Sequence, residues 1–212
     1  GVGTVQITNT GGTTFTTTVG SSSYSLALID IDESTTFSGS VDATAINNAA
    51  SKTATFSDNV TATITNSGTL LFNATDAKSV TGTIAEAAGG DTTEIKVINS
   101  ANGEAPSVVT FTGTVAADTL TIGTTTHGGA ALFEEAVTVP TINITGANSG
   151  DENSTATFNK AVTATTIVLD NSGIAGTAKI IFAANNSVTI TGTIDGASSD
   201  EGTIQVTGAT KT

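Results

Sequence analysis

The chain has 212 residues, of which 12% are charged, and its six Lys+Arg and 19 Asp+Glu give a formal net charge of −13. Cys, Met, Trp and Arg are absent, whereas 46 residues are Thr and eight are Phe. Disulfide frameworks, Cys-based zinc sites and thiol catalysis are therefore excluded, and the basic surface that nucleic-acid binding requires is missing.

The composition favours a folded all-β protein. Ile, Val, Leu and Phe make up about 23% of the chain, above the roughly 20% below which disorder is expected. Thr, Val and Ile are strand-forming residues. No run of about 18 apolar residues occurs, so no transmembrane helix is predicted.

Short apolar segments recur from one end of the chain to the other. A strand is predicted at residues 2–7, and a last one at residues 203–206. Between them one Phe recurs every 16–25 residues, except for one interval of 39 residues; the positions are Phe15, Phe37, Phe56, Phe72, Phe111, Phe133, Phe158 and Phe182. We interpret the long interval as two units, with Val97 in the Phe position of a degenerate unit. A repeat of this length is the size of one turn of a β-solenoid.

The spacing inside the repeat predicts where the chain turns. Four units place aliphatic residues four and nine positions after Phe; they are Phe37/Val41/Ile46, Phe111/Val115/Leu120, Phe133/Val137/Ile142 and Phe158/Val162/Ile167. A step of four keeps side chains on one face of a strand, whereas a step of five does not. We therefore expect a corner between the two aliphatic positions, for instance at residues 163–165. Polar stretches such as 146–154 and 170–177 are expected to form loops.

These patterns predict an all-β parallel β-helix (β-solenoid) of about nine to eleven coils that forms an elongated rod. Residues 1–212 are expected to be a single solenoid, with an irregular, loop-bearing stretch at residues 85–107. A pair of β-sandwich domains also uses many short strands, but it does not require one apolar template to recur at a near-constant period. Neither end of the predicted stack carries a cap, so we expect a longer natural chain or self-association through the ends.

The repeat units resemble those of large bacterial surface proteins. Segments such as TATFNKAVTATTIVLDNSG and VVTFTGTVAADTLTIG are similar to the degenerate repeats of autotransporter passenger domains, filamentous adhesins and repetitive surface-layer proteins. The resemblance covers most of the chain and concerns composition and period. It implies a parallel β-helix displayed outside the cell, with a structural, protective or adhesive role.

Few residues suggest catalysis. His127 falls in a predicted loop, without a GxSxG motif or comparable placement to support a catalytic triad. Glu134 and Glu135 are adjacent, and neighbours in a strand point to opposite faces, so we do not expect them to act together on a glycosidic bond. No catalytic, cofactor-binding or metal-ligating residue is assigned.

Acidic residues in predicted loops are candidate calcium ligands, because calcium prefers carboxylate oxygens. The clusters are Asp30/Asp32/Glu33, Asp151/Glu152 and Asp195/Asp200/Glu201. No EF-hand loop or glycine-rich calcium repeat accompanies them. The alternative explanation is a solvated acidic surface that keeps the rod soluble and limits lateral aggregation. No other cofactor is expected.

We therefore expect a non-enzymatic, secreted structural protein of the cell surface: a surface-layer, filament or adhesin scaffold that works by rigid repetitive self-assembly. Its expected partners are neighbouring copies in a surface assembly, or a glycan or host surface, and not nucleic acid. Two alternatives remain open. One is a binding module whose loops at residues 85–107 and 123–130 contact a glycan or host ligand, and the other is a carbohydrate-active β-helix enzyme.

Overall fold

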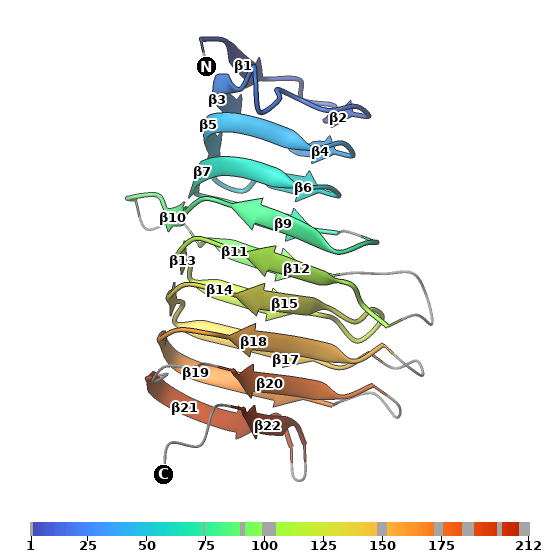
Figure 1. The fold of residues 1–212 in the computed structure, drawn as a ribbon, viewed down its shortest axis with the longest axis vertical. Helices are drawn as coiled ribbons and strands as arrows, with labels where there is room; N and C mark the ends of the chain where they lie inside the picture. Colours follow the sequence, from blue (N-terminus) through green and yellow to red (C-terminus); the bar gives the residue numbers. More distant parts are fainter. Residues whose placement is uncertain are drawn as a thin grey trace.

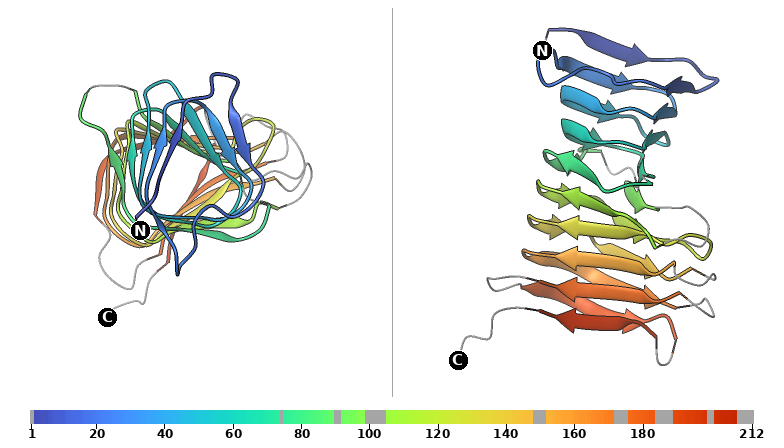
Figure 2. Two further views of the ribbon diagram at one scale, coloured as in Figure 1. Left: turned by 90° about the horizontal axis from the view of Figure 1, so that it is seen from above. Right: turned by 45° about the vertical axis from the view of Figure 1, so that its right-hand side comes forward.

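The computed structural model describes residues 2–73, 75–89, 92–98, 105–147, 152–171, 176–183, 189–198 and 201–207. Within these residues, 22 strands form one sheet in which successive turns pair in parallel. The sheet coils into a β-solenoid, seen from the side in Figure 1 and along its axis in the left view of Figure 2. The predicted all-β parallel solenoid is therefore confirmed. The described residues form no helix, so none of them provides a membrane-spanning helix.

Each turn contributes to three faces, which we number in chain order within a turn. Face 1 contains β2 (Thr13–Phe15), β4 (Thr35–Phe37), β6 (Thr53–Phe56), β8 (Thr69–Phe72), β11 (Glu94–Val97), β14 (Thr119–Ile122), β17 (Thr141–Thr145) and the second parts of β19 (Val162–Asp170) and β21 (Ile190–Gly196). Face 2 contains the first parts of β5 (Val41–Asn48) and β7 (Val60–Asn66), followed by β9 (Lys78–Thr81), β12 (Val108–Phe111), β15 (Ala130–Phe133), β18 (Ser154–Phe158), β20 (Ala178–Phe182) and β22 (Thr203–Val206). Face 3 contains β1 (Thr4–Ile7), β3 (Leu26–Ile31), the second parts of β5 and β7, then β10 (Ile84–Glu86), β13 (Val115–Ala116), β16 (Val137–Thr138) and the first parts of β19 and β21.

Alternation along each strand separates the core from the surface. In β6, Ala54 and Phe56 are buried, while Thr53 and Thr55 point outward and are half-exposed. This is the two-residue period of a strand with one buried face. The many Thr residues therefore supply β-branched strand positions whose hydroxyls face the solvent.

The predicted corner within the repeat is confirmed. Val162 lies on face 3 and Ile167 on face 1, and both side chains are fully buried. The register of β19 against β21 shifts between Thr163 and Thr166. The chain bends there and keeps both aliphatic side chains inside the solenoid, although their spacing of five would separate them in a straight strand.

The eight Phe side chains form two stacks. In the first, on face 1, ring centroids lie 5.1–5.5 Å apart and ring planes differ by 21° or less; it contains Phe15, Phe37, Phe56 and Phe72. In the second, on face 2, the centroids lie 4.9–6.1 Å apart and the planes differ by 26° or less; it contains Phe111, Phe133, Phe158 and Phe182. The same sequence template therefore occupies different faces in the two parts of the rod.

The change of face occurs between Phe72 and Phe111. Val97 pairs with Phe72, so the prediction that Val97 takes the Phe position is confirmed. The next strand on that face contributes Ile122, however, and Phe111 pairs with Val80 on face 2. After Phe72 the chain passes through β9, β10 and β11 before it reaches β12. From β8 to β12 it therefore makes one full turn and then moves on to the next face.

The number of coils was overestimated from the sequence. Counted from Phe15 to Phe182, the solenoid makes about seven turns, fewer than the nine to eleven coils expected. The 39-residue interval corresponds to one and a third turns and not to two coils, because the chain advances by four strands there, at three strands per turn.

The region expected to be irregular contains strands of the solenoid. Within residues 85–107, the described part includes β11, whose Ile95 and Val97 are fully buried between β8 and β14. Residues 90–91 and 99–104 lie outside the described residues. No Phe occurs in this stretch because Val97 occupies the position of the aromatic ring. Val97 is itself buried, so the core continues through it.

Buried and half-buried polar side chains link successive turns at the corner that precedes face 1. Asn48 Nδ2 donates to Asn66 Oδ1 at 2.8 Å, and Asn66 Nδ2 donates to the Gly68 carbonyl at 2.8 Å. Two turns further along, Asp118 Oδ2 accepts from the Thr93 backbone N–H at 2.8 Å, while the Asp118 N–H donates to Thr93 Oγ1 at 2.9 Å. Three of these four bonds engage backbone groups at the corner, and the Gly68 carbonyl also accepts from the Glu94 N–H of the next turn at 3.0 Å. The polar backbone groups at this corner are therefore hydrogen-bonded.

Candidate functional site

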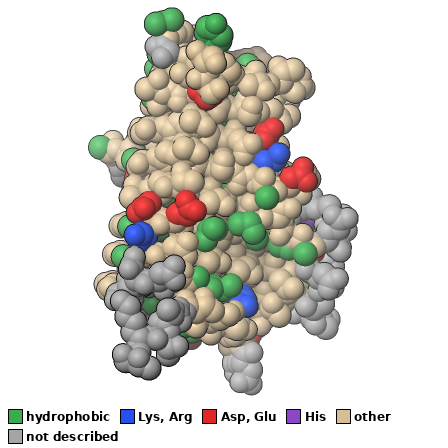
Figure 3. Space-filling model, in the orientation of Figure 1, with side chains coloured by type: hydrophobic (Ala, Val, Ile, Leu, Met, Phe, Trp, Pro, Cys, Tyr) green, Lys and Arg blue, Asp and Glu red, His purple; other side chains and the backbone are tan. Residues whose placement is uncertain are grey.

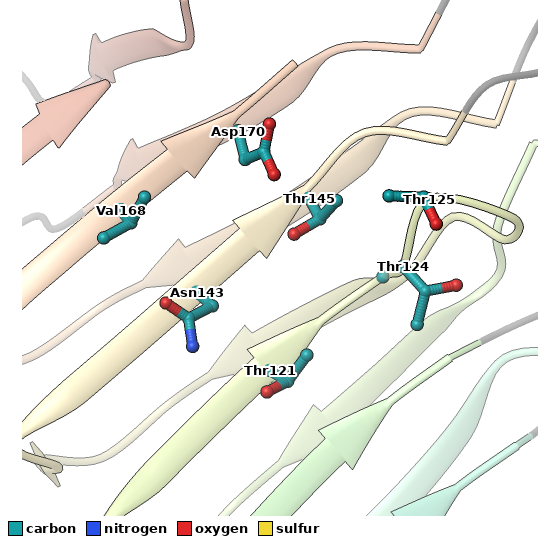
Figure 4. A pocket seen from close by; sticks show the side chains of 8 residues that line it. Thr121, Thr124, Thr125, Asn143, Thr145, Val168 and Asp170 are labelled. Atoms are coloured by element: carbon teal, nitrogen blue, oxygen red, sulfur yellow. The ribbon is translucent and has the colours of Figure 1, made fainter. Parts of the chain in front are cut away.

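A groove on the outer surface of face 1 is the best candidate for a binding site. It has a volume of about 380 Å³ and is lined by Thr121, Gly123, Thr124, Thr125, Asn143, Thr145, Val168 and Asp170. Figure 4 shows these residues on three successive turns, with the loop after β14 along one side. We call it the β17 groove, after the strand at its centre.

The floor of the β17 groove is built by parallel register. Thr121 of β14 pairs with Asn143 of β17, which pairs with Val168 of β19. Thr145 pairs with Asp170 in the same way, two residues further along each strand. Because successive turns lie roughly 4.8 Å apart, the groove presents a column of different side chains at a constant spacing.

The wall of the groove is the loop at residues 123–130, which the sequence had suggested as a ligand-contacting loop. Gly123 adopts a φ of 73° where β14 ends, and its N–H donates to the Val97 carbonyl at 2.9 Å. The Thr124 N–H donates to the His127 carbonyl at 2.7 Å, and Thr124 Oγ1 accepts from the His127 N–H at 3.1 Å. The loop is thus a compact hydrogen-bonded turn.

A buried serine attaches this wall to the neighbouring strands. Ser154 is fully buried, and its Oγ donates to the Thr145 carbonyl and accepts from the Gly129 N–H at 3.2 Å. One hydroxyl therefore joins β18, β17 and the end of the loop. The wall and the floor of the groove are held together before any ligand binds.

The charges around the groove are unevenly distributed. At the β11 end, Lys96 and Glu94 form an ion pair at 2.8 Å, and Thr121 Oγ1 donates to Glu94 Oε1 at 3.2 Å. At the other end Asp170 lines the groove, and Asp195 pairs with Val168 in the following turn. Among the described residues that line the groove there is no Lys, and Asp170 gives this lining a negative charge.

The remaining candidate residues do not form a catalytic arrangement. His127 is half-exposed, and its Nδ1 lies 3.0 Å from Thr126 Oγ1 of the same loop. The prediction that Glu134 and Glu135 are strand neighbours is wrong: both are exposed in the turn that follows Phe133, because β15 ends there. They lie outside the β17 groove.

The acidic clusters do not converge in the part of the chain that is described. No group of three His, Cys, Asp or Glu side chains there could hold a metal ion. Glu33 instead forms an ion pair with Lys52 at 2.7 Å, and Asp32 Oδ2 accepts from Gln6 Nε2 at 3.0 Å. Asp151 and Asp200 lie outside the described residues.

A second, smaller hollow lies on face 2. It has a volume of about 300 Å³ and is lined by Ala105, Pro106, Val108, Ala130, Ala131, Asn153, Thr155 and Thr157. Hydrophobic side chains gather in the middle of the face shown in Figure 3, where β12 and β15 lie in Figure 1. The side chain of Asn153 already forms hydrogen bonds within the protein. Its Oδ1 accepts from the Thr177 N–H at 2.9 Å and from Thr177 Oγ1 at 2.8 Å.

Sequence analysis identified the loop but not the floor of the groove. Asn143, Thr145 and Val168 occupy outward strand positions that resemble many others in a Thr-rich chain. These residues could have been identified by aligning the outward-facing positions of successive turns. Such an alignment requires the register in which the strands of those turns pair.

Comparison of the chain with family models, with curated proteins and with solved structures finds no match.

Proposed function

We propose that this chain is a non-enzymatic structural segment of an extracellular surface assembly, in which a rigid, repetitive rod sets length and spacing. The observation that carries the proposal is the continuous series of contacts between Phe rings in the core. Consecutive Phe rings are in contact from Phe15 to Phe182, including the point where the stack changes face. A rod of this kind resists bending because each turn is packed against both neighbours.

The outer surface also fits a scaffold. Backbone atoms and side chains that are neither charged nor hydrophobic cover most of the face shown in Figure 3. The chain carries only six Lys against 19 Asp+Glu. A net negative charge limits unspecific lateral association of exposed sheets, so that assembly would depend on specific contacts between rods.

Electron microscopy of the purified chain tests this proposal. We expect ordered filaments or sheets, and we expect the Phe133→Ala variant to lose them on mild heating, because it weakens the core of the rod. Tyr24→Ala is the matched control, since Tyr24 is 84% exposed and contributes little to the core. Discrete particles at all concentrations, or release of reducing sugar from a polysaccharide, would contradict the scaffold role.

A second candidate function is a binding module. The observation that favours it is the β17 groove, whose wall is the loop at residues 123–130. A glycan array probed with the monomeric chain would test this function. Reproducible binding to a defined set of glycans supports it, and the absence of any bound glycan would contradict it.

A further inference from the structure

We infer that the β17 groove binds an uncharged, hydroxyl-rich chain, namely a neutral glycan that runs along the solenoid axis across β14, β17 and β19. This inference rests on the second of the two proposed functions, and it adds the site, the ligand class and the direction in which the ligand lies.

Unused hydrogen-bonding groups line the groove. Among the described residues, the amide of Asn143 and the hydroxyls of Thr125 and Thr145 have no hydrogen-bond partner, and Figure 4 shows them around one hollow. Asn48 and Asn66 differ, because their amides hold neighbouring turns together. A free carboxamide offers two donors and one acceptor, which suits a ligand whose hydroxyls both donate and accept.

The floor of the groove is also partly apolar. Val168 lies beside Asn143 in the register, and each Thr contributes a methyl group as well as a hydroxyl. A pyranose ring has C–H faces bordered by hydroxyl groups. It can therefore cover the valine and methyl surface while its hydroxyls reach Asn143 and Thr145, which combines apolar burial with hydrogen bonding in one site.

The charges select a neutral ligand. Asp170 lines the groove and Asp195 stands in the next turn, whereas Lys96 at the opposite end is already paired with Glu94. An anionic glycan would meet like charge, and no described residue that lines the groove offers a cation to compensate, which disfavours its binding.

The register fixes the direction of the ligand. Thr121, Asn143 and Val168 occupy equivalent positions on three turns roughly 4.8 Å apart, so only a ligand that runs along the axis can contact all three. The central strand, β17, is paired on both sides with neighbouring turns. A peptide therefore cannot join the sheet there as an extra strand.

The groove is formed before binding. Ser154 joins the loop to β17, and Gly123 ties the loop to Val97 of the preceding turn. Little backbone has to be ordered when a ligand binds, which reduces the entropic penalty of association.

Titration of the isotope-labelled chain with oligosaccharides tests the inference. The probes are maltohexaose, cellohexaose and mannohexaose as neutral chains, and hexagalacturonate as an anionic chain. We expect at least one neutral probe to shift the side-chain amide signals of Asn143 in a saturable way at millimolar concentration. The Asn143→Ala variant should bind it about tenfold more weakly, as expected for the loss of one or two hydrogen bonds.

Asn47→Ala is the matched control. Asn47 is also an outward Asn on a strand of this sheet, but it is exposed on β5 and lies outside the groove. We expect this variant to bind like the unmodified chain, and both variants to keep the β-sheet circular dichroism of the unmodified chain.

The outcomes separate the site from the function. Neutral glycan binding that is equal in all three proteins would overturn the groove assignment and leave the binding module standing. No response to any neutral probe, tighter binding of hexagalacturonate, or an Asn143-dependent response only to a polar peptide would overturn the inference. None of these results bears on the filaments expected for the scaffold role.

Discussion

The rings of Phe72 and Phe111 meet edge to face, with centroids 5.1 Å apart and planes 90° apart, although the two residues lie on different faces of the solenoid. Every other contact between consecutive Phe rings is stacked. This contact is the place where the sequence template moves by one face. An edge-to-face pair lets the aromatic core turn the corner without a gap, because its geometry is as favourable as an offset stack.

Replacing Phe111 with Ala should therefore destabilise the rod strongly. The ring is 1% exposed and contacts both Phe72 and Phe133, and truncation of a buried Phe to Ala costs about 3–5 kcal/mol. Urea unfolding followed by circular dichroism measures the change. Tyr24→Ala is the control, and we expect it to leave the midpoint nearly unchanged. A Phe111→Ala midpoint equal to that of Tyr24→Ala would show that the junction contributes no packing energy.

The general architecture could be predicted from the sequence because a parallel solenoid repeats one apolar template. The Phe-to-Val spacing of four and the further step of five were sufficient to predict the corner between Val162 and Ile167. The rotation of the template at Phe72 could not be predicted, because the 39-residue interval fits either two turns or one turn and a third. Which of these two lengths the interval spans depends on which strands pair, and no single residue within the interval determines that pairing.

The candidate site was predictable only in part. The loop at residues 123–130 was identified because Gly and polar residues cluster there. Asn143 and Val168 were not identified, because outward positions become neighbours only through the pairing of turns that lie about 25 residues apart. The adjacent Glu134 and Glu135 were placed in a strand because the end of β15 at Phe133 is not marked by Gly or Pro.

The buried asparagine pair gives a second prediction. Asn66→Ala removes the closest of the three acceptors of Asn48 Nδ2, the other two being the Lys52 and Thr69 carbonyls at 3.3 and 3.2 Å, and leaves both backbone groups of Gly68 without their side-chain partner. Loss of one partner of a buried hydrogen bond costs about 1–3 kcal/mol, so the urea midpoint should fall. The matched control is Asn47→Ala, which removes an exposed amide from the same strand as Asn48. Equal midpoints for the two variants would show that the asparagine pair is not stabilising.

Gly82 gives a third prediction. Its φ is 122°, and a Cβ added to it would lie 2.1 Å from the carbonyl oxygen of Ala62 in the preceding turn. Gly82→Ala should destabilise the rod by about 2 kcal/mol or more, because it combines backbone strain with a steric overlap. At Gly11 an added Cβ would meet only the side chain of Asn9 at 3.9 Å, so Gly11→Ala is the control. Thermal unfolding compares the two, and equal melting temperatures would contradict the close approach of turns at Gly82.

Asp58 gives a prediction about pH. The Asn59 backbone N–H donates to Asp58 Oδ1 at 2.7 Å, and Lys78 Nζ lies 3.1 Å from the same oxygen. The hydrogen bond from the Asn59 N–H is the largest effect and lowers the pKa of Asp58 below its usual value. Desolvation opposes it, and the Lys78 ammonium lowers the pKa further. The folded state therefore favours the charged carboxylate. The resulting stabilisation is fully present above the unfolded pKa of about 3.9 and is lost as the pH falls through the lower folded pKa.

Melting temperatures measured from neutral to acidic pH test this linkage. Asp58→Asn should lower the melting temperature at neutral pH, and the difference from the unmodified chain should shrink below about pH 4, where the unfolded carboxyl becomes protonated. The control is Asp195→Asn, which removes one negative charge from an exposed side chain without a hydrogen bond or ion pair among the described residues. Asp195→Asn should show no comparable pH-dependent loss. A difference for Asp58→Asn that stays constant, or that grows as the pH falls, would show that the carboxylate at this position is not stabilised by folding.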